Sequence, residues 1–301
     1  MRPMRPMRPM RPVPAVRPGP RPGFTLIEVI VAIVIFAALG ATTAVFYRPA
    51  VESFLGLRTR AALVDEADGA LRLMLRDVRS AVPNSIRSPD TSCFELVPTR
   101  TGGRYRAGPD IAHPGDGALW LDTSTTTTEF DVLGPLSATP QVNDWLVVDN
   151  QNPDDVYSGS NRSVIRQVST PPASAGTLRL RVDTQQFPLG YDGGRFSVVP
   201  ASEGAVFYVC AGASSTLDGR GDAPGVLYRL KNYGFNASAP NACPSTTGAA
   251  VVTRQVSACR FVYTANQAAT QQSGFISVQI ELTRANTRAS LTMGAHVMNV
   301  P

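Results

Sequence analysis

The pattern of hydrophobic and polar positions changes three times along this chain. Residues 1–22 have no apolar period and consist of four Met-Arg-Pro repeats followed by further Pro and Arg. Proline at this density prevents a regular helix, and the segment has too few apolar residues to form a core. A mostly apolar segment then runs from Phe24 to Phe46, about the length that a helix needs to cross a bilayer.

A helical period continues beyond this apolar segment. Apolar residues recur every three or four positions, and charged residues occupy much of the remaining surface. We therefore expect one long helix from Phe24 to about Val82, with a kink or a locally unwound stretch near Gly40 and Pro49. We expect the apolar stripe to pack mainly on the protein's own β-sheet rather than on a neighbouring subunit. Its members are Leu63, Ala67, Ala70, Leu71, Met74, Leu75 and Val78. The charged set is Arg60, Asp65, Glu66, Asp68, Arg72, Arg76, Asp77 and Arg79.

The period becomes strand-like after Pro83, where short apolar runs alternate with clusters of Gly, Pro, Asn, Asp and Ser. This pattern predicts an α+β protein, with the long helix packed on an antiparallel, β-rich head. The head is either one body or two packed lobes that divide near residue 200. The candidate strands are 93–97, 118–121, 130–133, 145–148, 164–168, 178–182, 196–199, 206–210, 226–230, 250–256, 259–263, 275–282 and 290–297.

Charge is distributed unevenly between the first residues and the rest of the chain. The whole chain has 28 Lys and Arg against 23 Asp and Glu, but six of the arginines and none of the acids lie in residues 1–23. Without that segment the balance is 22 minus 23, or −1. A basic surface that would bind nucleic acid is therefore not predicted.

The four cysteines, Cys93, Cys210, Cys243 and Cys259, all follow the apolar segment. Four cysteines allow three pairings, and free buried thiols are a further alternative. We favour Cys243 with Cys259, which closes a short loop, and Cys93 with Cys210. These disulfides fit an oxidising compartment. We predict no catalytic residues, no metal site and no cofactor. The Arg220-Gly221-Asp222 tripeptide is expected to be a chance match in a loop. The Asp-rich stretches 149–155 and 218–222 are expected to be solvated turns, with calcium-stabilised loops as the alternative.

One carboxylate, Glu28, lies within the apolar segment, five residues after Gly23. An ionised carboxylate at membrane depth costs roughly 2.5–3.5 kcal/mol on insertion scales, so this position is a functional hypothesis by default. A cut after Gly23 would create a positive partner for Glu28, the free amine of Phe24.

Gly23-Phe24-Thr25-Leu26-Ile27-Glu28 before an apolar helix resembles the type IV prepilin signal. Type IV pilins, minor pilins and type II secretion pseudopilins share this signal. The resemblance implies cleavage after Gly23 by a prepilin peptidase, which also N-methylates Phe24, and an assembly role for Glu28. An ordinary secretory signal peptide and a simple signal anchor remain the other interpretations.

Segments outside the N-terminus resemble, more loosely, the MshO-type minor pilins of the MSHA (mannose-sensitive haemagglutinin) pilus system, with PilW-like minor pilins as near neighbours. They are residues 79–87, 93–99, 102–106, 256–263 and 296–301. This resemblance implies a non-enzymatic minor pilin that enters, primes or caps a pilus. A type II secretion pseudopilin and a pilus-tip adhesin are the alternatives.

The resemblance also implies how the chain is organised and where it is located. We expect a removable leader (1–23), a transmembrane and filament-core helix (24–48), its amphipathic continuation (49–82) and a periplasmic head (83–301). The implied partners are the prepilin peptidase, the inner-membrane assembly platform, and other major and minor pilins. The protein would cross the inner membrane once before assembly and would then lie in a pilus at the cell surface.

Overall fold

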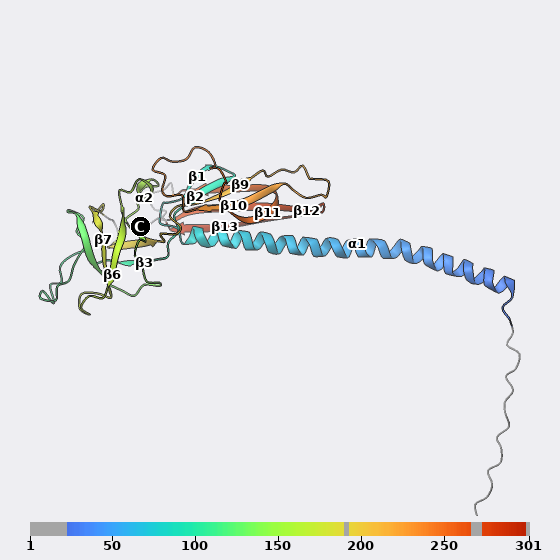
Figure 1. Ribbon diagram of the computed structural model, residues 1–301, viewed down its shortest axis with the longest axis horizontal. Coiled ribbons are helices and arrows are strands. Elements are labelled where there is room, and N and C mark those ends of the chain that lie inside the picture. The colour runs from blue at the N-terminus through green and yellow to red at the C-terminus, as the bar shows by residue number, and fades with distance from the viewer. Residues whose placement is uncertain (1–22, 190–192, 266–272, 299–301) are drawn as a thin grey trace, which may run out of the picture. The chain divides into compact units, whose positions relative to one another are not determined.

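The computed structural model describes residues 23–189, 193–265 and 273–298 (Figure 1). The leader predictions therefore lie outside the described residues, apart from Gly23. The described chain contains the long helix α1 (Leu26–Arg79), the short helix α2 (Asp155–Ser158) and thirteen strands. Every strand pair within the sheets is antiparallel. The predicted α+β class, with a long N-terminal helix before an antiparallel β-rich region, is confirmed.

The backbone of α1 is helical throughout, including Gly40 and Pro49. The predicted unwound stretch is therefore wrong. A single proline removes one intrahelical hydrogen bond, and the turns on either side retain theirs. The boundary between two compact units of the chain falls within this helix, between Leu55 and Gly56.

The last turns of α1 run along a seven-stranded sheet (Figure 1). Its strand order is β1-β2-β9-β10-β11-β12-β13. The seven apolar stripe residues of α1 are all at most 5% exposed, and they share one core with residues of this sheet such as Phe94, Tyr208 and Phe261. The prediction that the stripe packs on the protein's own sheet is confirmed. The strands are β1 (Arg87–Asp90), β2 (Cys93–Leu96), β9 (Val206–Ala211), β10 (Gly225–Lys231), β11 (Ala250–Thr264), β12 (Ser273–Arg284) and β13 (Thr287–Met298).

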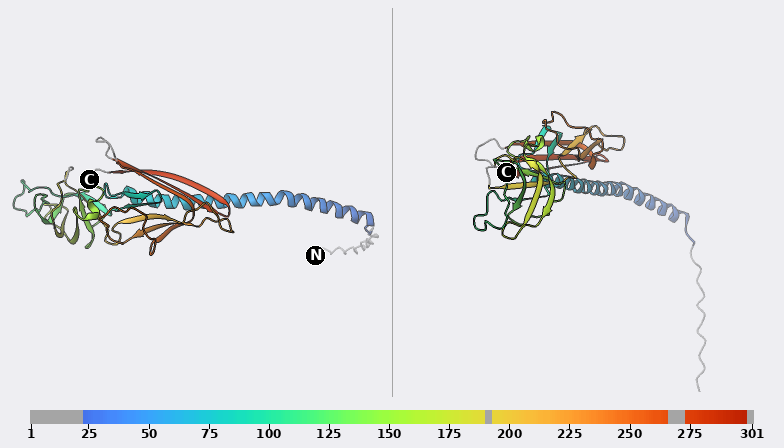
Figure 2. Two further views of the ribbon diagram at one scale, coloured as in Figure 1. Left: turned by 90° about the horizontal axis from the view of Figure 1, so that it is seen from above. Right: turned by 60° about the vertical axis from the view of Figure 1, so that its left-hand side comes forward.

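The long strands β11, β12 and β13 form an antiparallel ribbon at one side of this sheet (Figure 2). β11 was expected as two strands, 250–256 and 259–263, and this division is wrong. The strand continues through an irregularity between Val256 and Ala258, where its pairing with β12 shifts register. Gln255 just before it has a φ of 59°. A bulge of this kind bends a strand without ending it.

The second sheet comprises the strands between β2 and β9 in the sequence, in the order β3-β8-β5-β6-β7-β4. Its two edges meet, because Arg106 N–H donates to Asp131 O and Leu133 N–H donates to Arg104 O. The sheet therefore closes into a small barrel around a core that includes Phe130, Leu146 and Phe196. Its strands are β3 (Thr101–Arg104), β4 (Thr127–Val132), β5 (Trp145–Val148), β6 (Arg162–Ser169), β7 (Leu178–Gln185) and β8 (Arg195–Val199).

The barrel is an insertion in the seven-stranded sheet. β2 and β9 are hydrogen-bonded neighbours, although about a hundred residues separate them in sequence. The chain thus passes between the two sheets twice, after Leu96 and after Val199. A third apolar cluster, which includes Val82, Val97, Tyr157 and Val199, links the barrel strands to the segments that enter and leave the larger sheet.

Candidate functional site

The N-terminal end of α1 carries the predicted processing and assembly residues. Gly23 and Phe24 lie in irregular backbone immediately before the helix. Thr25 caps the helix, because its side-chain oxygen accepts the Glu28 N–H at 3.3 Å and its carbonyl accepts the Val29 N–H at 3.2 Å. Glu28 is therefore in the first helical turn, where the partial positive charge of the helix end favours a carboxylate. The sequence carries a signal for this cap in Thr25-Leu26-Ile27-Glu28, because a Thr-x-x-Glu pattern is typical of a helix N-terminus.

Within the part of the chain that the structure describes, nothing requires a glycine at position 23. A Cβ built there meets no heavy atom within 4 Å, and its φ lies outside the positive range that favours glycine. The neighbouring Phe24 side chain is 83% exposed. The identities of these two residues therefore do not serve packing within the described chain.

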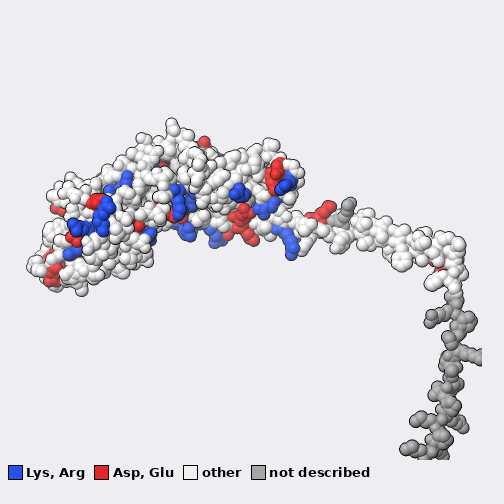
Figure 3. Space-filling view, viewed as in Figure 1, with Lys and Arg blue, Asp and Glu red and all other residues white. Residues whose placement is uncertain are grey.

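The first half of α1 exposes apolar side chains around its whole circumference. Phe36 is 73% exposed and Phe46 is 77% exposed, and no residue of the chain from 24 to 47 is buried. Charged side chains are sparse along this half and frequent from residue 52 onward (Figure 3). Among the described residues, α1 is the one helix long and apolar enough to cross a membrane, judged by length and composition. A helix that is apolar on every side needs lipid or other helices around it.

The second half of α1 is fixed to the seven-stranded sheet by polar contacts as well as apolar packing. Asp77 is 5% exposed and accepts hydrogen bonds from the Tyr208 hydroxyl and the Arg229 Nε, each at 2.8 Å. Arg229 also pairs with Glu203. The placement of Asp77 on the polar surface of the helix was wrong, because it is a buried anchor. Burial raises the pKa of Tyr208, and its Asp77 partner adds to the shift.

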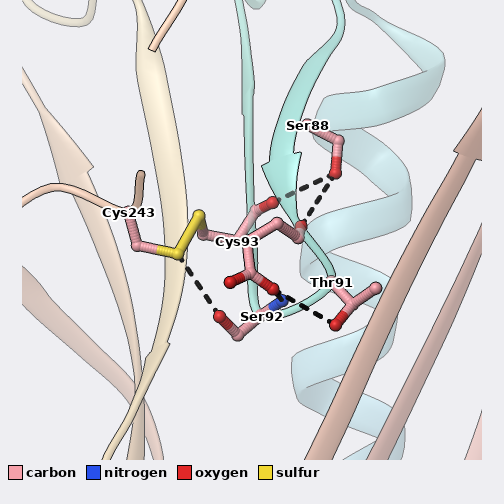
Figure 4. The surroundings of a disulfide bond; sticks show 6 residues. Ser88, Thr91, Ser92, Cys93 and Cys243 are labelled. Carbon is pink, nitrogen blue, oxygen red and sulfur yellow. Dashed lines mark hydrogen bonds between the residues drawn. A yellow bond between two sulfur atoms is a disulfide. The ribbon is translucent and has the colours of Figure 1, made fainter. Parts of the chain in front are cut away.

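The four cysteines form two disulfides, Cys93 with Cys243 and Cys210 with Cys259. The favoured pairing of Cys243 with Cys259 and Cys93 with Cys210 is therefore wrong. The prediction favoured cysteines that are close in the sequence, whereas sheet pairing, which the local pattern does not show, brings β2, β9 and β11 together. Figure 4 shows the first bond, where the Ser92 hydroxyl lies 3.3 Å from the Cys243 sulfur and Ser88 hydrogen-bonds the Cys93 carbonyl. This bond ties the segment after β10 to the start of β2.

A buried ion cluster lies where the barrel meets the larger sheet. The side chain of Arg87 is 4% exposed and contacts Glu95 at 2.6 Å and Asp154 at 2.8 Å. Its guanidinium also lies 3.4 Å from the centre of the Tyr157 ring. Burial raises the pKa of Glu95, although Arg87 and the Tyr233 hydroxyl, which donates to it at 2.6 Å, act in the opposite direction. This cluster was not predicted from the sequence, since Arg87 and Glu95 have no local pattern that marks them as buried.

The Arg-Gly-Asp tripeptide and the Asp-rich stretches lie in turns, where their carboxylates accept hydrogen bonds from within the chain. In the Arg220-Gly221-Asp222 segment, Asp222 accepts the Ala285 N–H at 2.8 Å and the Gln255 side-chain amide at 2.9 Å. In the 149–155 stretch, Asp155 accepts the Asn152 N–H at 2.8 Å. Within the described residues, no group of three His, Cys, Asp or Glu side chains is arranged to hold a metal ion.

Comparison with known protein families identifies one match, to the prokaryotic N-terminal methylation motif over residues 21–44. Comparisons with curated proteins and with solved structures found no match. The matched segment contains Gly23, Phe24 and Glu28 and covers less than a tenth of the chain, so it carries no information on the head. The match and the apolar helix that follows it support a type IV pilin-like or pseudopilin protein.

Proposed function

We propose that this chain is a minor type IV pilin, made as a prepilin, that enters, primes or caps a pilus of the MSHA-like type. The single observation that carries the proposal is the methylation motif at the start of α1. The structure adds that Gly23 is free of packing and positive-φ constraints. A glycine that the fold does not need is a reasonable recognition residue for a peptidase.

The proposed processing reaction is hydrolysis of the Gly23–Phe24 peptide bond, followed by methylation of the new Phe24 amine. Both residues lie outside the helix and are exposed, so an enzyme can reach them without unwinding α1. The arginines before Gly23 would stay on the cytoplasmic side of the inner membrane, by the positive-inside rule. The head would then lie in the periplasm, where disulfides form and persist.

The proposed assembly step uses the charge of Glu28 and the apolar surface of α1. In a bundle of packed helices, Glu28 of one subunit would pair with the Phe24 amine of a neighbour. Such a pair compensates a charge that is otherwise costly to bury, and it fixes register more than it adds net stability. The exposed apolar side chains of residues 24–47 would supply the remaining contacts.

The size of the head favours a minor rather than a major subunit. The inserted barrel adds six strands to the seven-stranded sheet that packs on α1. A head enlarged in this way suits the end of a filament or a priming complex with other minor pilins, because a repeating shaft leaves less room around each subunit. We therefore propose a non-enzymatic role in pilus biogenesis, adhesion or motility. A type II secretion pseudopilin shares the N-terminal features and is the alternative.

Three variants test this proposal when each is co-expressed with a prepilin peptidase and the other pilins. Gly23→Leu should block cleavage, whereas the control Gly19→Leu, four residues earlier in the leader, should be cleaved normally. Glu28→Ala should be cleaved but should enter filaments poorly, whereas the matched control Glu52→Ala on the same helix should enter them at wild-type levels. Wild-type amounts of the cleaved Glu28 variant in purified filaments would refute the pairing step. Genes for retraction or for secreted cargo beside this one would separate the pilus from the secretion filament.

A further inference from the structure

A shallow hollow of about 280 Å³ lies on the outside of the inserted barrel, far in sequence from the processing segment. It is lined by the segment before β4 and by the first residues of β4. Its lining residues are Leu119, Trp120, Asp122, Thr125, Thr126, Thr127, Thr128 and Glu129. The hollow thus combines one large aromatic ring, two carboxylates and several hydroxyls.

Trp120 is the distinctive residue of this hollow. It is one of two tryptophans in the chain, and it is 40% exposed. The other, Trp145 in β5, packs edge-on against Phe235 beside the third apolar cluster. Among the described residues, Trp120 has neither an aromatic neighbour nor a hydrogen-bond acceptor for its indole N–H. Tryptophan normally buries its ring and satisfies its N–H, so an exposed ring beside polar groups is typical of binding surfaces.

Contacts on both sides of Trp120 fix the backbone of the 117–121 segment. Leu121 is 1% exposed and anchors one side of it in the barrel core. On the other side, the fully buried carboxylate of Asp131 accepts the Leu119 N–H at 2.8 Å. Arg179 pairs with Asp131 at 2.6 Å and donates to the Gly117 carbonyl at 2.8 Å. A buried ion pair contributes little net stability, so its clearest effect here is to fix the position of the 117–121 segment.

The polar groups of the hollow are available to a ligand. Within the part of the chain that the structure describes, the hydroxyls of Thr125, Thr126 and Thr128 and the carboxylate of Glu129 have no hydrogen-bond partner. Asp122 accepts two hydrogen bonds from Ser124 on one oxygen, and these lower the pKa of Asp122, so it is ionised at neutral pH. Two carboxylates beside an aromatic ring repel anions and accept hydrogen bonds from hydroxyl groups.

We propose that this hollow binds a neutral oligosaccharide, with one pyranose ring stacked on Trp120 and its hydroxyls donating to Asp122 and Glu129. A pyranose has an apolar face of C–H groups and a rim of hydroxyls, which matches a flat ring bordered by acceptors. Ligand sites of this kind have an apolar surface and a few fixed polar groups. This inference deepens the adhesive role in the proposed function by naming a ligand class, but binding requires only the barrel and not filament assembly.

Isothermal titration of the full chain with defined hexasaccharides tests this proposal. The protein is purified in a detergent without a sugar headgroup, because a glycosidic detergent would compete for the site. Cellohexaose, chitohexaose and mannohexaose are the neutral probes, and hexagalacturonate is the acidic comparison. We expect saturable binding of at least one neutral probe and no binding of the acidic one. Trp120→Ala should weaken the binding about tenfold, whereas Val142→Ala, which truncates another exposed apolar side chain on the barrel, should leave it unchanged.

Three results would overturn the proposal. They are no saturable binding of any neutral probe, equal binding by the Trp120→Ala variant, and tighter binding of the acidic hexasaccharide. If the Trp120→Ala variant instead lost filament incorporation without any glycan effect, the hollow would be a contact with another pilin. A chain that is cleaved and assembled but binds no glycan contradicts this inference alone, and a chain that binds glycan but is not cleaved contradicts the proposed function alone.

Discussion

The contact between α1 and the seven-stranded sheet gives the sharpest prediction for stability, because two aspartates on the same helix differ in their burial and in the partners that they bind. Asp77 is 5% exposed and binds Tyr208 and Arg229. The Asp68 side chain is 31% exposed and, among the described residues, its ion-pair partner is Arg72, whose side chain is 74% exposed. We compare Asp77→Ala with Asp68→Ala. Both changes give the helix the same gain in intrinsic propensity, so that contribution cancels in the comparison.

The expected loss in the free energy of unfolding depends on which partners each variant leaves without an ion pair. Breaking a buried pair costs about 3–5 kcal/mol, and the lower end applies here because Arg229 keeps Glu203 as a partner. An exposed pair four residues apart on a helix contributes only about 0.3–0.5 kcal/mol. At about 2–4 °C per kcal/mol for a domain of this size, a loss of about 3 kcal/mol lowers Tm by about 6–12 °C.

Thermal denaturation of the full chain in detergent, followed by near-ultraviolet circular dichroism, measures both variants under one condition. Asp77→Ala should show the large decrease in Tm, and Asp68→Ala should lie within about 2 °C of the wild type. Hydrogen exchange should show lost protection in residues 63–78 of the Asp77 variant, with the barrel unchanged. Equal shifts in Tm for the two variants would refute the conclusion that Asp77 anchors the helix.

Three further predictions concern the head. Gly225→Ala should prevent folding, because the added Cβ would contact the Val256 carbonyl and would lie 2.7 Å from the Ala213 Cα. Its control is Gly69→Ala in α1, where the Cβ has open space, and this change should raise the free energy of unfolding in chemical denaturation by about 0.5–1 kcal/mol. Burial alone would raise the pKa of Glu203, but its bonds to Arg229 lower it below the ordinary value of 4.5. The unfolded chain then binds the proton more readily, so the stability from Glu203 is present above about pH 4.5 and is lost as the pH falls further. Tm of the Glu203→Gln variant should therefore fall less than wild type between about pH 6 and pH 3, and parallel falls would contradict this. Peptide mapping without reduction should recover Cys93 linked to Cys243 and Cys210 linked to Cys259, and any other linkage would contradict the sheet order.

The elements that the sequence predicted well are those with a strong local period. The stripe from Leu63 to Val78 has helical spacing, and it is the buried face of α1. The run at 145–148 coincides with β5, and the clean alternation at 178–182 lies within β7. A local signal was sufficient in these cases. One face of α1 and of β7 is buried by the fold, which gives a period, whereas both faces of β5 are buried, so its signal is a short apolar run.

The elements that the sequence missed lack that period or depend on distant pairing. β1 contains Pro89 and lies at the edge of its sheet, where proline is tolerated. β3 contains Gly102 and Gly103, a residue type that is depleted in strands, and it lies where the six-stranded sheet closes. The run at 118–121 was expected as a strand, but it forms only isolated bonds to Asp131 and Arg106. The disulfide pairing depends on β2 and β9 becoming neighbours across the inserted barrel, which no local pattern records.

The residues of the candidate site also divide into those that a local sequence signal marks and those that only the folded chain reveals. Gly23, Phe24 and Glu28 are readable from sequence because a peptidase signal is a linear motif. The buried Arg87–Glu95 pair and the hollow at Trp120 are not, although the residues of each lie close together in the sequence, since no local pattern shows which of their side chains are buried and which are exposed. A charged or aromatic residue in a polar stretch is normally solvated, and only the three-dimensional contacts distinguish these positions.

The most direct test of the central proposal is the mature N-terminus of the full chain co-expressed with a prepilin peptidase, read by intact and peptide mass spectrometry. The proposal predicts a product that begins at N-methylated Phe24. An uncut chain, or a chain cut beyond the apolar segment that ends at Phe46, would contradict it and would leave a signal-anchored or secreted β-protein in its place.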